Sequence, residues 1–342
     1  MLQTAMAEEP DLDHARERIL KPSVTLDGWP EVKGYDFNDE WDFSTFVESF
    51  GTTGFQAHAL HRAISITREM QDTKSQIFLG YTSNMVSSGL RESIRWLVEH
   101  DKVALLTTTA GGIEEDIIKC LKPFVLGSYE AKGSVLRSEG INRTGNLLIP
   151  NDRYLYLERF LTPLFAKMLE RQQTTGEVLS ESEFIYYLGL ELNDERSILT
   201  WASRNNIPYF CPGIYDGAIG DMLYFFKKKH PEFVIDAAKD VVRAYDFANN
   251  CERVGIIALG GSVPKHFIAN LNILRDGADY AVYITTAQEY EGSNAGANTE
   301  EAISWGKISE DAKHQKVVAE ATLVFPLFVK AAFVDHVRIA KD

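Results

Sequence analysis

This chain of 342 residues has only three cysteines and no apolar run long enough to cross a membrane. Cys120, Cys211 and Cys251 lie far apart, without a C-x-x-C pair or nearby histidines, which argues against a disulfide framework or zinc site and favours a reducing, cytoplasmic compartment. The apolar stretch over 321–334 is interrupted by a proline and a lysine and falls short of the ~20 residues of a membrane span. The acidic N-terminus lacks the basic and apolar regions of a signal peptide.

Positive charge is also in short supply, because 35 Lys and Arg residues face 49 Asp and Glu residues, a net charge of −14. Such a surface repels phosphate backbones and anionic lipids, so nucleic acid and membranes are not expected partners and cationic molecules are. Hydrophobic residues make up 45% of the chain, enough for a large core and too many for a disordered protein.

Apolar strand-like segments alternate with helical ones along most of the chain. The clearest strands are Val254–Leu259 (VGIIAL) and 280–285 (YAVYIT), and residues 87–100 place four apolar side chains on one helical face. This alternation predicts an α/β fold with a doubly wound, mostly parallel sheet. Residues 1–45 are polar and punctuated by proline and glycine, which predicts an irregular N-terminal arm, followed by one large domain over 46–342.

Three predicted strand ends carry unusual loops, at 107–116 (TTTAGGIEED), 259–266 (LGGSVPKH) and 285–296 (TTAQEYEGSNAG). In open parallel sheets, ligands bind beyond the carboxyl ends of the strands, where glycines and helix N-termini favour a pyrophosphate. A dinucleotide is therefore one candidate ligand. The chain contains neither G-x-G-x-x-G nor G-x-x-x-x-G-K-[ST], so the residues alone leave this ligand open.

Three groups of polar side chains could carry chemistry. The acids Glu114–Asp116 mark either the start of a helix over 114–121 or a carboxylate cluster for a cationic substrate. His266 is either a solvated helix residue or a general base. Lys307 is either a solvated lysine or, beside Trp305, an amine whose lowered pKa suits imine formation. These residues lead to an α/β protein acting on a polyamine or a similar cation.

Longer motifs carry a resemblance that covers the chain from about Val32 to Phe333. They are Val32–Asn38 (VKGYDFN), Phe50–Gln56 (FGTTGFQ), Phe78–Gly89 (FLGYTSNMVSSG), Thr108–Leu121 (TTAGGIEEDIIKCL), Gly140–Pro150 (GINRTGNLLIP), Asp216–Met222 (DGAIGDM), Gly277–Gly292 and Glu301–Ile308 (EAISWGKI). Together they resemble deoxyhypusine synthase, and TTAGGIEED with EAISWGK is close to diagnostic of that family.

The resemblance implies a homotetramer of Rossmann-like, NAD-binding subunits with active sites at subunit interfaces. In this family NAD oxidises spermidine, 1,3-diaminopropane is released, and the 4-aminobutyl group is held as an imine on a lysine. The group then passes to one lysine of the translation initiation factor 5A precursor, and the hydride returns, so that no net redox change occurs.

The resemblance also implies residue roles. Lys307 matches the imine-forming lysine, His266 the base, and Glu115 a further catalytic residue. The residues expected to bind spermidine are Glu114, Glu115, Asp221, His266, Asn270, Tyr283, Gly292, Ser293, Asn294, Glu301, Trp305 and Lys307. The residues expected to bind NAD are Ser83, Asn84, Met85, Val86, Ser87, Thr109, Ala110, Gly111, Glu115, Asp216, Gly261, Thr286, Ala287, Glu320 and Ala321. No metal is expected.

The chain departs from the family pattern at three positions. Ser262 replaces a usual glycine, Glu320 a usual aspartate, and Asn294 a usual substrate-side acid. Because an amide brings no charge, the sequence predicts that Asn294→Asp tightens spermidine binding, unless Glu291 already compensates.

Three other functions stay open on the sequence alone. A homospermidine synthase would share the scaffold and the lysine chemistry and use putrescine as the acceptor. A regulatory, non-catalytic paralogue would not need Lys307, His266 and Glu115, all of which are present. A plain NAD dehydrogenase would accumulate NADH with spermidine.

Overall fold

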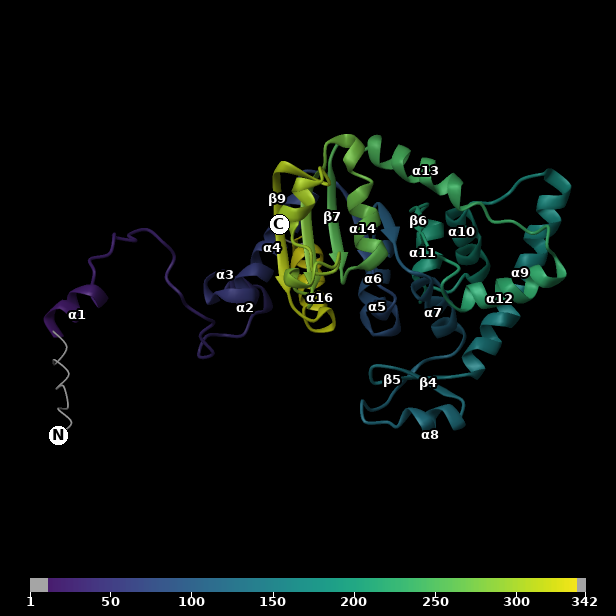
Figure 1. The fold of residues 1–342 in the computed structure, drawn as a ribbon, viewed down its shortest axis with the longest axis horizontal. Coiled ribbons are helices and arrows are strands. Elements are labelled where there is room, and N and C mark those ends of the chain that lie inside the picture. Colours follow the sequence, from purple (N-terminus) through teal and green to yellow (C-terminus); the bar gives the residue numbers. More distant parts are fainter. Residues whose placement is uncertain (1–11, 337–342) are drawn as a thin grey trace, which may run out of the picture.

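A computed structural model describes residues 12–336 of the chain (Figure 1). Its strands are β1 (Gln76–Tyr81), β2 (Leu105–Thr107), β3 (Val125–Leu126), β4 (Ile141–Thr144), β5 (Leu147–Pro150), β6 (Tyr209–Phe210), β7 (Val254–Leu259), β8 (Ala278–Thr285) and β9 (Ile308–Val318). Its helices are α1 (Leu12–Ile19), α2 (Phe43–Glu48), α3 (Phe50–Thr53), α4 (Phe55–Asp72), α5 (Asn84–Ser87), α6 (Leu90–Glu99), α7 (Ala110–Leu121), α8 (Gly133–Ser138), α9 (Asp152–Thr175), α10 (Glu181–Leu192), α11 (Ile198–Arg204), α12 (Ala218–Lys229), α13 (Ala237–Asn249), α14 (Ser262–Asn270), α15 (Thr299–Ser304) and α16 (Ala321–Val329). Two short 3-10 helices, η1 (Ile273–Arg275) and η2 (Glu289–Glu291), and one π-helix, η3 (Lys330–Val334), complete the list.

Six parallel strands form the main sheet, in the order β6-β2-β1-β7-β8-β9. The chain begins the sheet at β1, moves outward through β2 to β6, and then returns to the other side of β1 with β7, β8 and β9. This is the strand order of doubly wound dinucleotide-binding sheets, whose ligand crevice lies at the carboxyl ends of the two strands where the winding reverses. Those strands are β1 and β7. The predicted doubly wound, mostly parallel α/β fold is confirmed.

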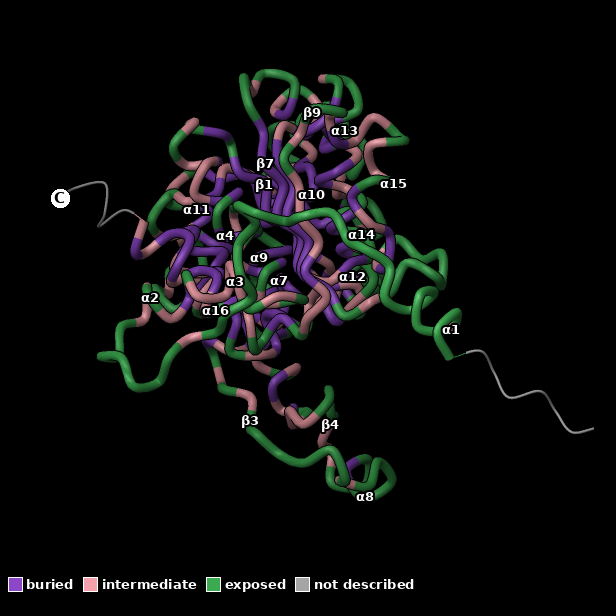
Figure 2. Tube along the Cα trace, turned by 90° about the vertical axis from the view of Figure 1, so that its left-hand side faces the viewer, coloured by how far each residue is buried: buried purple, intermediate pink, exposed green. Residues whose placement is uncertain are grey.

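Helices cover both faces of this sheet, and the strands run buried through the centre of the molecule (Figure 2). Alternate side chains of β7 enter two cores: Ile257 and Leu259 pack with α4, α6, α7 and α16, whereas Ile256 and Ala258 pack with α13 and α14. The two cores matter for function because they place α7 and α14 on opposite faces of the sheet.

Apolar periodicity predicted the elements well but misplaced some of their starts. The helical face of Leu90, Ile94, Leu97 and Val98 is buried in α6, as expected. The helix predicted to start at Glu114 instead begins at Ala110, because Thr109 has an extended backbone and the helix starts directly after it, so the acids lie beyond its first turn. The sequence also predicts a helix over Phe233–Asn249, but this helix begins only at Ala237, where the Asp236 side chain caps it.

The start of α14 also differs from the expectation. Ser262 followed by Pro264 predicts a helix capped by Ser262, but Ser262 is the first residue of α14 and the N-cap is Gly261. Ser262 has a positive φ of 57°, in the left-handed region that non-glycine residues rarely adopt.

Two segments lie outside the main sheet. An antiparallel sheet of order β3-β5-β4, which the sequence analysis did not predict, projects below the body together with α8 (Figure 1). Helix α1 and the extended segment after it reach away from the body at the N-terminal end. The division of the chain into an arm over 1–45 and a domain over 46–342 stays a prediction, of which residues 1–11 and 337–342 lie outside the described residues.

Residues 12–336 lack two features. No helix there is long and apolar enough to cross a bilayer. Nor does that part of the chain contain a group of three His, Cys, Asp or Glu side chains arranged to hold a metal ion. The cysteines are all free thiols; Cys120 and Cys211 are buried, as small apolar residues are.

Candidate active site

The loops that follow β1, β2 and β7 meet at the carboxyl edge of the sheet. The Ser83 backbone N–H donates to Thr109 Oγ1 over 3.2 Å, and the Thr82 N–H donates to the Leu259 carbonyl over 3.4 Å. A Cβ on Gly111 would lie 2.8 Å from Ser83 Cβ, so only glycine allows this approach. The strand-end loops selected from the sequence therefore lie together, at the point where the winding of the sheet reverses.

Residues expected to bind NAD all lie beyond the carboxyl ends of the main-sheet strands. Ser83, Asn84, Met85, Val86 and Ser87 follow β1; Thr109, Ala110 and Gly111 follow β2; Asp216 follows β6; Gly261 follows β7; Thr286 and Ala287 follow β8; Glu320 and Ala321 follow β9. The side chains of Met85, Val86, Ala110 and Ala321 belong to the core, so only their backbone can face a ligand. The Glu320 carboxylate caps α16 by accepting from the Leu323 N–H over 3.2 Å.

The Glu115 side chain lies on α7 beside this crevice, where it accepts a hydrogen bond from Ser87 Oγ. Burial raises the pKa of Glu115 to about 7, despite this hydrogen bond. One turn further along α7, the Lys119 ammonium donates to the carbonyl oxygens of Val86, Ser87 and Ser88 over 2.7–3.3 Å. Lys119 was not among the residues expected at this site, although its spacing of four residues from Glu115 places both on the same helical face.

Glu114 holds a neighbouring helix. Its carboxylate accepts from the Ile219 N–H over 2.9 Å at the first turn of α12, and burial raises its pKa. Asp216 and Asp221, at either end of that first turn, are close enough to raise the Glu114 pKa further. The expected spermidine ligand Glu114 is thus already engaged, whereas Asp221 and Asp216 are exposed beside it.

Asp116 is hydrogen-bonded in the protein interior, at the start of α11. It is fully buried, and its Oδ2 accepts from Ser197 Oγ over 2.7 Å and from the Leu199 N–H over 3.0 Å at the start of α11. Three consecutive acids therefore face three different surroundings. The interpretation of these acids as the first turn of a helix was wrong.

Lys307 lies on the opposite face of the sheet, next to a small cavity of about 40 Å³. The residues lining it are Lys265, Ala269, Tyr283, Asn294, Ala297, Asn298, Glu301, Ala302, Trp305 and Lys307. The Lys307 ammonium lies 5.6 Å from the centre of the Trp305 ring, and burial lowers its pKa although Glu301 acts in the other direction. A lowered pKa of Lys307 is the direction expected from the sequence. Burial and Lys307 also lower the pKa of His266, on α14.

Tyr283 supplies a polar atom to this cavity that has no partner. Its side chain is 1% exposed, and its hydroxyl makes no hydrogen bond with any described residue. Buried hydroxyls are normally hydrogen-bonded, so an orphan one indicates where a ligand can bind. The aromatic wall opposite is more open than expected, because Trp305 is 66% exposed at the end of α15.

The remaining expected spermidine ligands surround the cavity without all facing it. Asn270 donates to the Tyr245 hydroxyl over 2.7 Å, at the far end of α14. Gly292 and Ser293 lie on the exposed loop after β8, where Ser293 Oγ donates to Glu291 over 3.1 Å.

The structure therefore separates the expected site into two clusters. The acid cluster comprises Glu114, Glu115, Asp216 and Asp221, and the lysine cluster comprises His266, Tyr283, Glu301, Trp305 and Lys307. Within residues 12–336, no hydrogen bond, ion pair or shared cavity joins Glu115 to Lys307.

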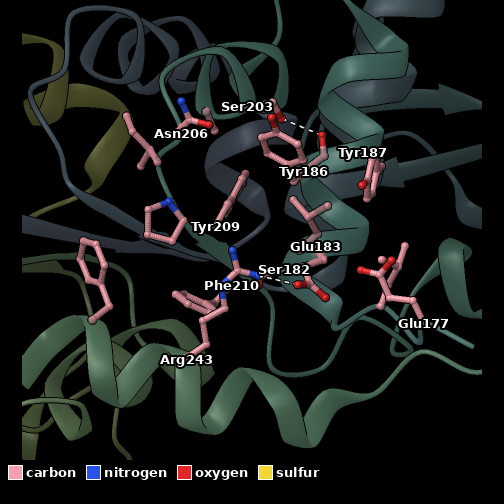
Figure 3. A pocket seen from close by; sticks show the side chains of 16 residues that line it. Glu177, Ser182, Glu183, Tyr186, Tyr187, Ser203, Asn206, Tyr209, Phe210 and Arg243 are labelled. Carbon is pink, nitrogen blue, oxygen red and sulfur yellow. Dashed lines mark hydrogen bonds and ion pairs between the residues drawn. The ribbon is translucent and has the colours of Figure 1, made fainter. Parts of the chain in front are cut away.

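A larger cavity of about 410 Å³ lies elsewhere, between α10, α11, α13 and the outer strand β6 (Figure 3). Its acids are already paired, Glu183 with Arg243 at 3.4 Å and Glu177 with Arg171 at 2.7 Å. No expected site residue lines it, so its size does not make it the active site.

The strand order, the crevice between β1 and β7 and the glycine-spaced loops define a doubly wound α/β protein of the dinucleotide-binding class. The family model for deoxyhypusine synthase matches residues 45–332. The chain belongs to the deoxyhypusine synthase family, which is a family of transferases.

Curated relatives and a solved structure agree with this assignment. A deoxyhypusine synthase from Musa acuminata is 46% identical over 350 residues, covering 94% of this chain and 93% of the relative. Homospermidine synthase 1 from Senecio vernalis is 45% identical over 356 residues, covering 96% of each chain. A crystal structure from Entamoeba histolytica, provisionally assigned to the same family, matches with a TM-score of 0.65 and 32% identity, over 89% of this chain and 97% of that one.

Proposed function

We propose that this protein is a deoxyhypusine synthase, which transfers the 4-aminobutyl group of spermidine to a lysine of the translation initiation factor 5A precursor. The group travels as an imine on Lys307, and 1,3-diaminopropane is released. The observation that carries the proposal is the lysine cluster, in which a lysine of lowered pKa shares a cavity with one carboxylate and an unpartnered buried hydroxyl.

The crevice at the carboxyl edge fits NAD, the cofactor of this family. Gly111 lets the loop after β1 pack directly against the first turn of α7, and the buried Thr108 hydroxyl there has no hydrogen-bond partner among the described residues. Ser83, Thr109 and Asp216 would hold the cofactor at this edge. Bound NAD supplies the acceptor and, later, the donor of the hydride.

The chain's own residues would act as follows. Glu301 and the acid cluster bind the ammonium groups, and neutral His266 accepts a proton from the substrate amine. The neutral Lys307 amine attacks the carbon of the oxidised substrate, a bond from Lys307 Nζ forms, and the bond to 1,3-diaminopropane breaks. The acceptor lysine then displaces Lys307 in the same way, and reduction of the new imine completes the transfer.

Because the two clusters lie on opposite faces of one sheet, we infer that each active site combines the acid cluster of one copy with the lysine cluster of another. This accounts for the open Trp305 wall in a single chain. It agrees with the homotetramer expected from the sequence.

The test is Lys307→Arg, which keeps the charge but cannot form an imine. Incubation with spermidine, NAD and the precursor protein, followed by mass spectrometry, should show deoxyhypusine with the wild type and none with the variant. Borohydride should trap a 4-aminobutyl adduct on Lys307 only in the wild type. Lys313→Arg is the matched control, because Lys313 is exposed on β9, the strand that directly follows Lys307, is paired with Glu69, and should retain activity. An active Lys307→Arg variant would contradict the proposal.

Homospermidine synthase is the second candidate. The 45% identity to the Senecio vernalis enzyme is close to the 46% identity to the Musa acuminata deoxyhypusine synthase, so the observation that favours this candidate is Asn294, which replaces an acid. Putrescine added in place of the precursor protein distinguishes the two functions, since only a homospermidine synthase would convert it efficiently to homospermidine.

A further inference from the structure

The loop over 292–298 forms one wall of the cavity beside Lys307 (the lysine cavity). It is hydrogen-bonded to the first turn of α14. The Lys265 ammonium, 4% exposed, donates to the carbonyl oxygens of Asn294 and Ala297 over 2.7 Å each and lies 4.4 Å from the centre of the Tyr283 ring. A Cβ on Gly261 would overlap Ala295, so the loop backbone rests directly on the start of the helix. The wall is therefore built around a buried ammonium.

The Asn294 side chain adds a further contact between the loop and α14. Its amide Nδ2 donates to the Ser262 carbonyl over 2.8 Å. Ser262 is the residue with the positive φ of 57°, so the amide fixes a carbonyl whose orientation is unusual. Two of the three departures from the family pattern thus contact one another.

A carboxylate could not make this contact. Both its oxygens accept and neither donates at neutral pH, so an aspartate at 294 would oppose the Ser262 carbonyl oxygen. The same loop holds the buried ammonium of Lys265 through the Asn294 carbonyl, so a displaced residue 294 would also weaken that bond. These contacts argue against the sequence-based expectation that Asn294→Asp tightens substrate binding.

We propose that Asn294 is a positioning residue, whose amide locks the loop over 292–298 onto α14 and so fixes the width of the lysine cavity. Asn294 then influences the amine substrate through the loop and not through charge. Among residues 12–336, Glu301 is the single carboxylate lining the cavity, which accordingly accepts one ammonium group, the free end of a transferred aminoalkyl group. The statement about the ammonium group rests on the proposed function. The attachment of the loop to α14 by the Asn294 amide, called the lock below, does not.

Limited proteolysis tests the lock without reference to activity. Tyr290, 89% exposed beside the loop, is a chymotrypsin site. The lost hydrogen bond should make cleavage after Tyr290 about fivefold faster in Asn294→Asp and Asn294→Ala, because a neutral hydrogen bond accounts for roughly that factor. Asn250→Asp, an exposed position where no side-chain hydrogen bond is found, carries the same charge change and should be cleaved like the wild type. Unchanged cleavage in both Asn294 variants would overturn the lock.

Steady-state kinetics with spermidine test the consequence. The lock predicts a KM several-fold higher in Asn294→Asp and in Asn294→Ala, whereas a charge contact predicts a lower KM in Asn294→Asp alone. Ser262→Gly tests the contact from its other side, because glycine accommodates the positive φ without the amide and should partly restore the KM of Asn294→Asp. A lower KM in Asn294→Asp with unchanged cleavage would overturn the proposal. An inactive wild type would contradict the proposed function and leave the proteolysis result to decide the lock.

Discussion

At Glu115, stability and function oppose each other. A carboxyl group whose burial raises its pKa to about 7 destabilises the folded chain whenever it is ionised. Natural proteins retain such groups where a ligand needs them, and here the ligand would be an ammonium group beside the crevice. The same reasoning applies to Lys307 and His266, because burial lowers the pKa of each and so shifts both nitrogen atoms towards the neutral form.

This opposition predicts the pH dependence of stability. Because the folded pKa of Glu115 lies above its ordinary value of 4.5, the folded state holds the proton more tightly, and stability falls as pH rises from about 4.5 to about 7. Glu115→Gln should remove this loss and stabilise the protein at pH 8 by up to about 3 kcal/mol, an upper bound because solvent reaches the half-buried group. Thermal unfolding at pH 5 and pH 8 measures the difference, which should be small at pH 5.

Glu181→Gln is the matched control. Glu181 is buried on α10, is a member of neither cluster, and its pKa is also raised to about 7. This variant should gain stability with the same pH dependence and keep its activity, whereas Glu115→Gln should lose transfer. Equal stability of Glu115→Gln and wild type at pH 8 would contradict the assignment of an ionised, buried carboxylate.

At the scale of elements, the acids of α7 connect helices that are distant in the sequence. Glu114 binds the start of α12, and Asp116 binds the start of α11, each more than 80 residues along the chain. Isolated helix ends leave backbone N–H groups without partners, and these carboxylates satisfy them. Helix α7 therefore serves as the support on which α11 and α12 are placed.

Asp116→Ala should consequently be severely destabilising. It would leave Ser197 Oγ, the Leu199 N–H and the Arg91 guanidinium, 3.8 Å away, without a buried carboxylate, and such losses amount to about 3 kcal/mol or more. Glu92→Ala is the control, because Glu92 pairs with the same Arg91 at 2.8 Å but is exposed, and it should lose under about 1 kcal/mol. Urea unfolding at one fixed protomer concentration would show this, and similar losses in both variants would refute the capping role.

The elements themselves could largely be predicted from the sequence, since each depends on local apolar spacing. VGIIAL is the strand β7 with the predicted ends, and the apolar face of α6 is buried as expected. The separate roles of Glu114, Glu115 and Asp116 could not be predicted, because each is determined by a backbone N–H or hydroxyl group from another part of the chain. The contacts of Lys265 and Lys119 could not be predicted for the same reason. Their partners are backbone carbonyl oxygens, which every residue has, so the sequence does not identify them.

At the scale of the whole molecule, the sheet decides how the site is divided. The crevice between β1 and β7 follows from the strand order, and the acid cluster lies beside it on the α7 face. Lys307 directly precedes β9, near the amino edge, and its cavity lies on the α14 face. The sequence motifs indicate that all these residues share one function, but no feature of the sequence shows that the sheet separates them.

This division predicts complementation between two inactive variants. If each site combines Glu115 of one copy with Lys307 of another, co-expressed Glu115→Gln and Lys307→Arg chains should regain about a quarter of the wild-type transfer activity, because one pairing in four joins two intact residues. Each variant alone should be inactive. In the control, Glu115→Gln is co-expressed with a chain carrying both substitutions; no pairing then contains an intact Glu115, and no activity should return. Deoxyhypusine formation per assembled protomer is the measurement. Inactive mixed assemblies that still form and bind NAD would show that Glu115 and Lys307 do not act together across two copies of the chain.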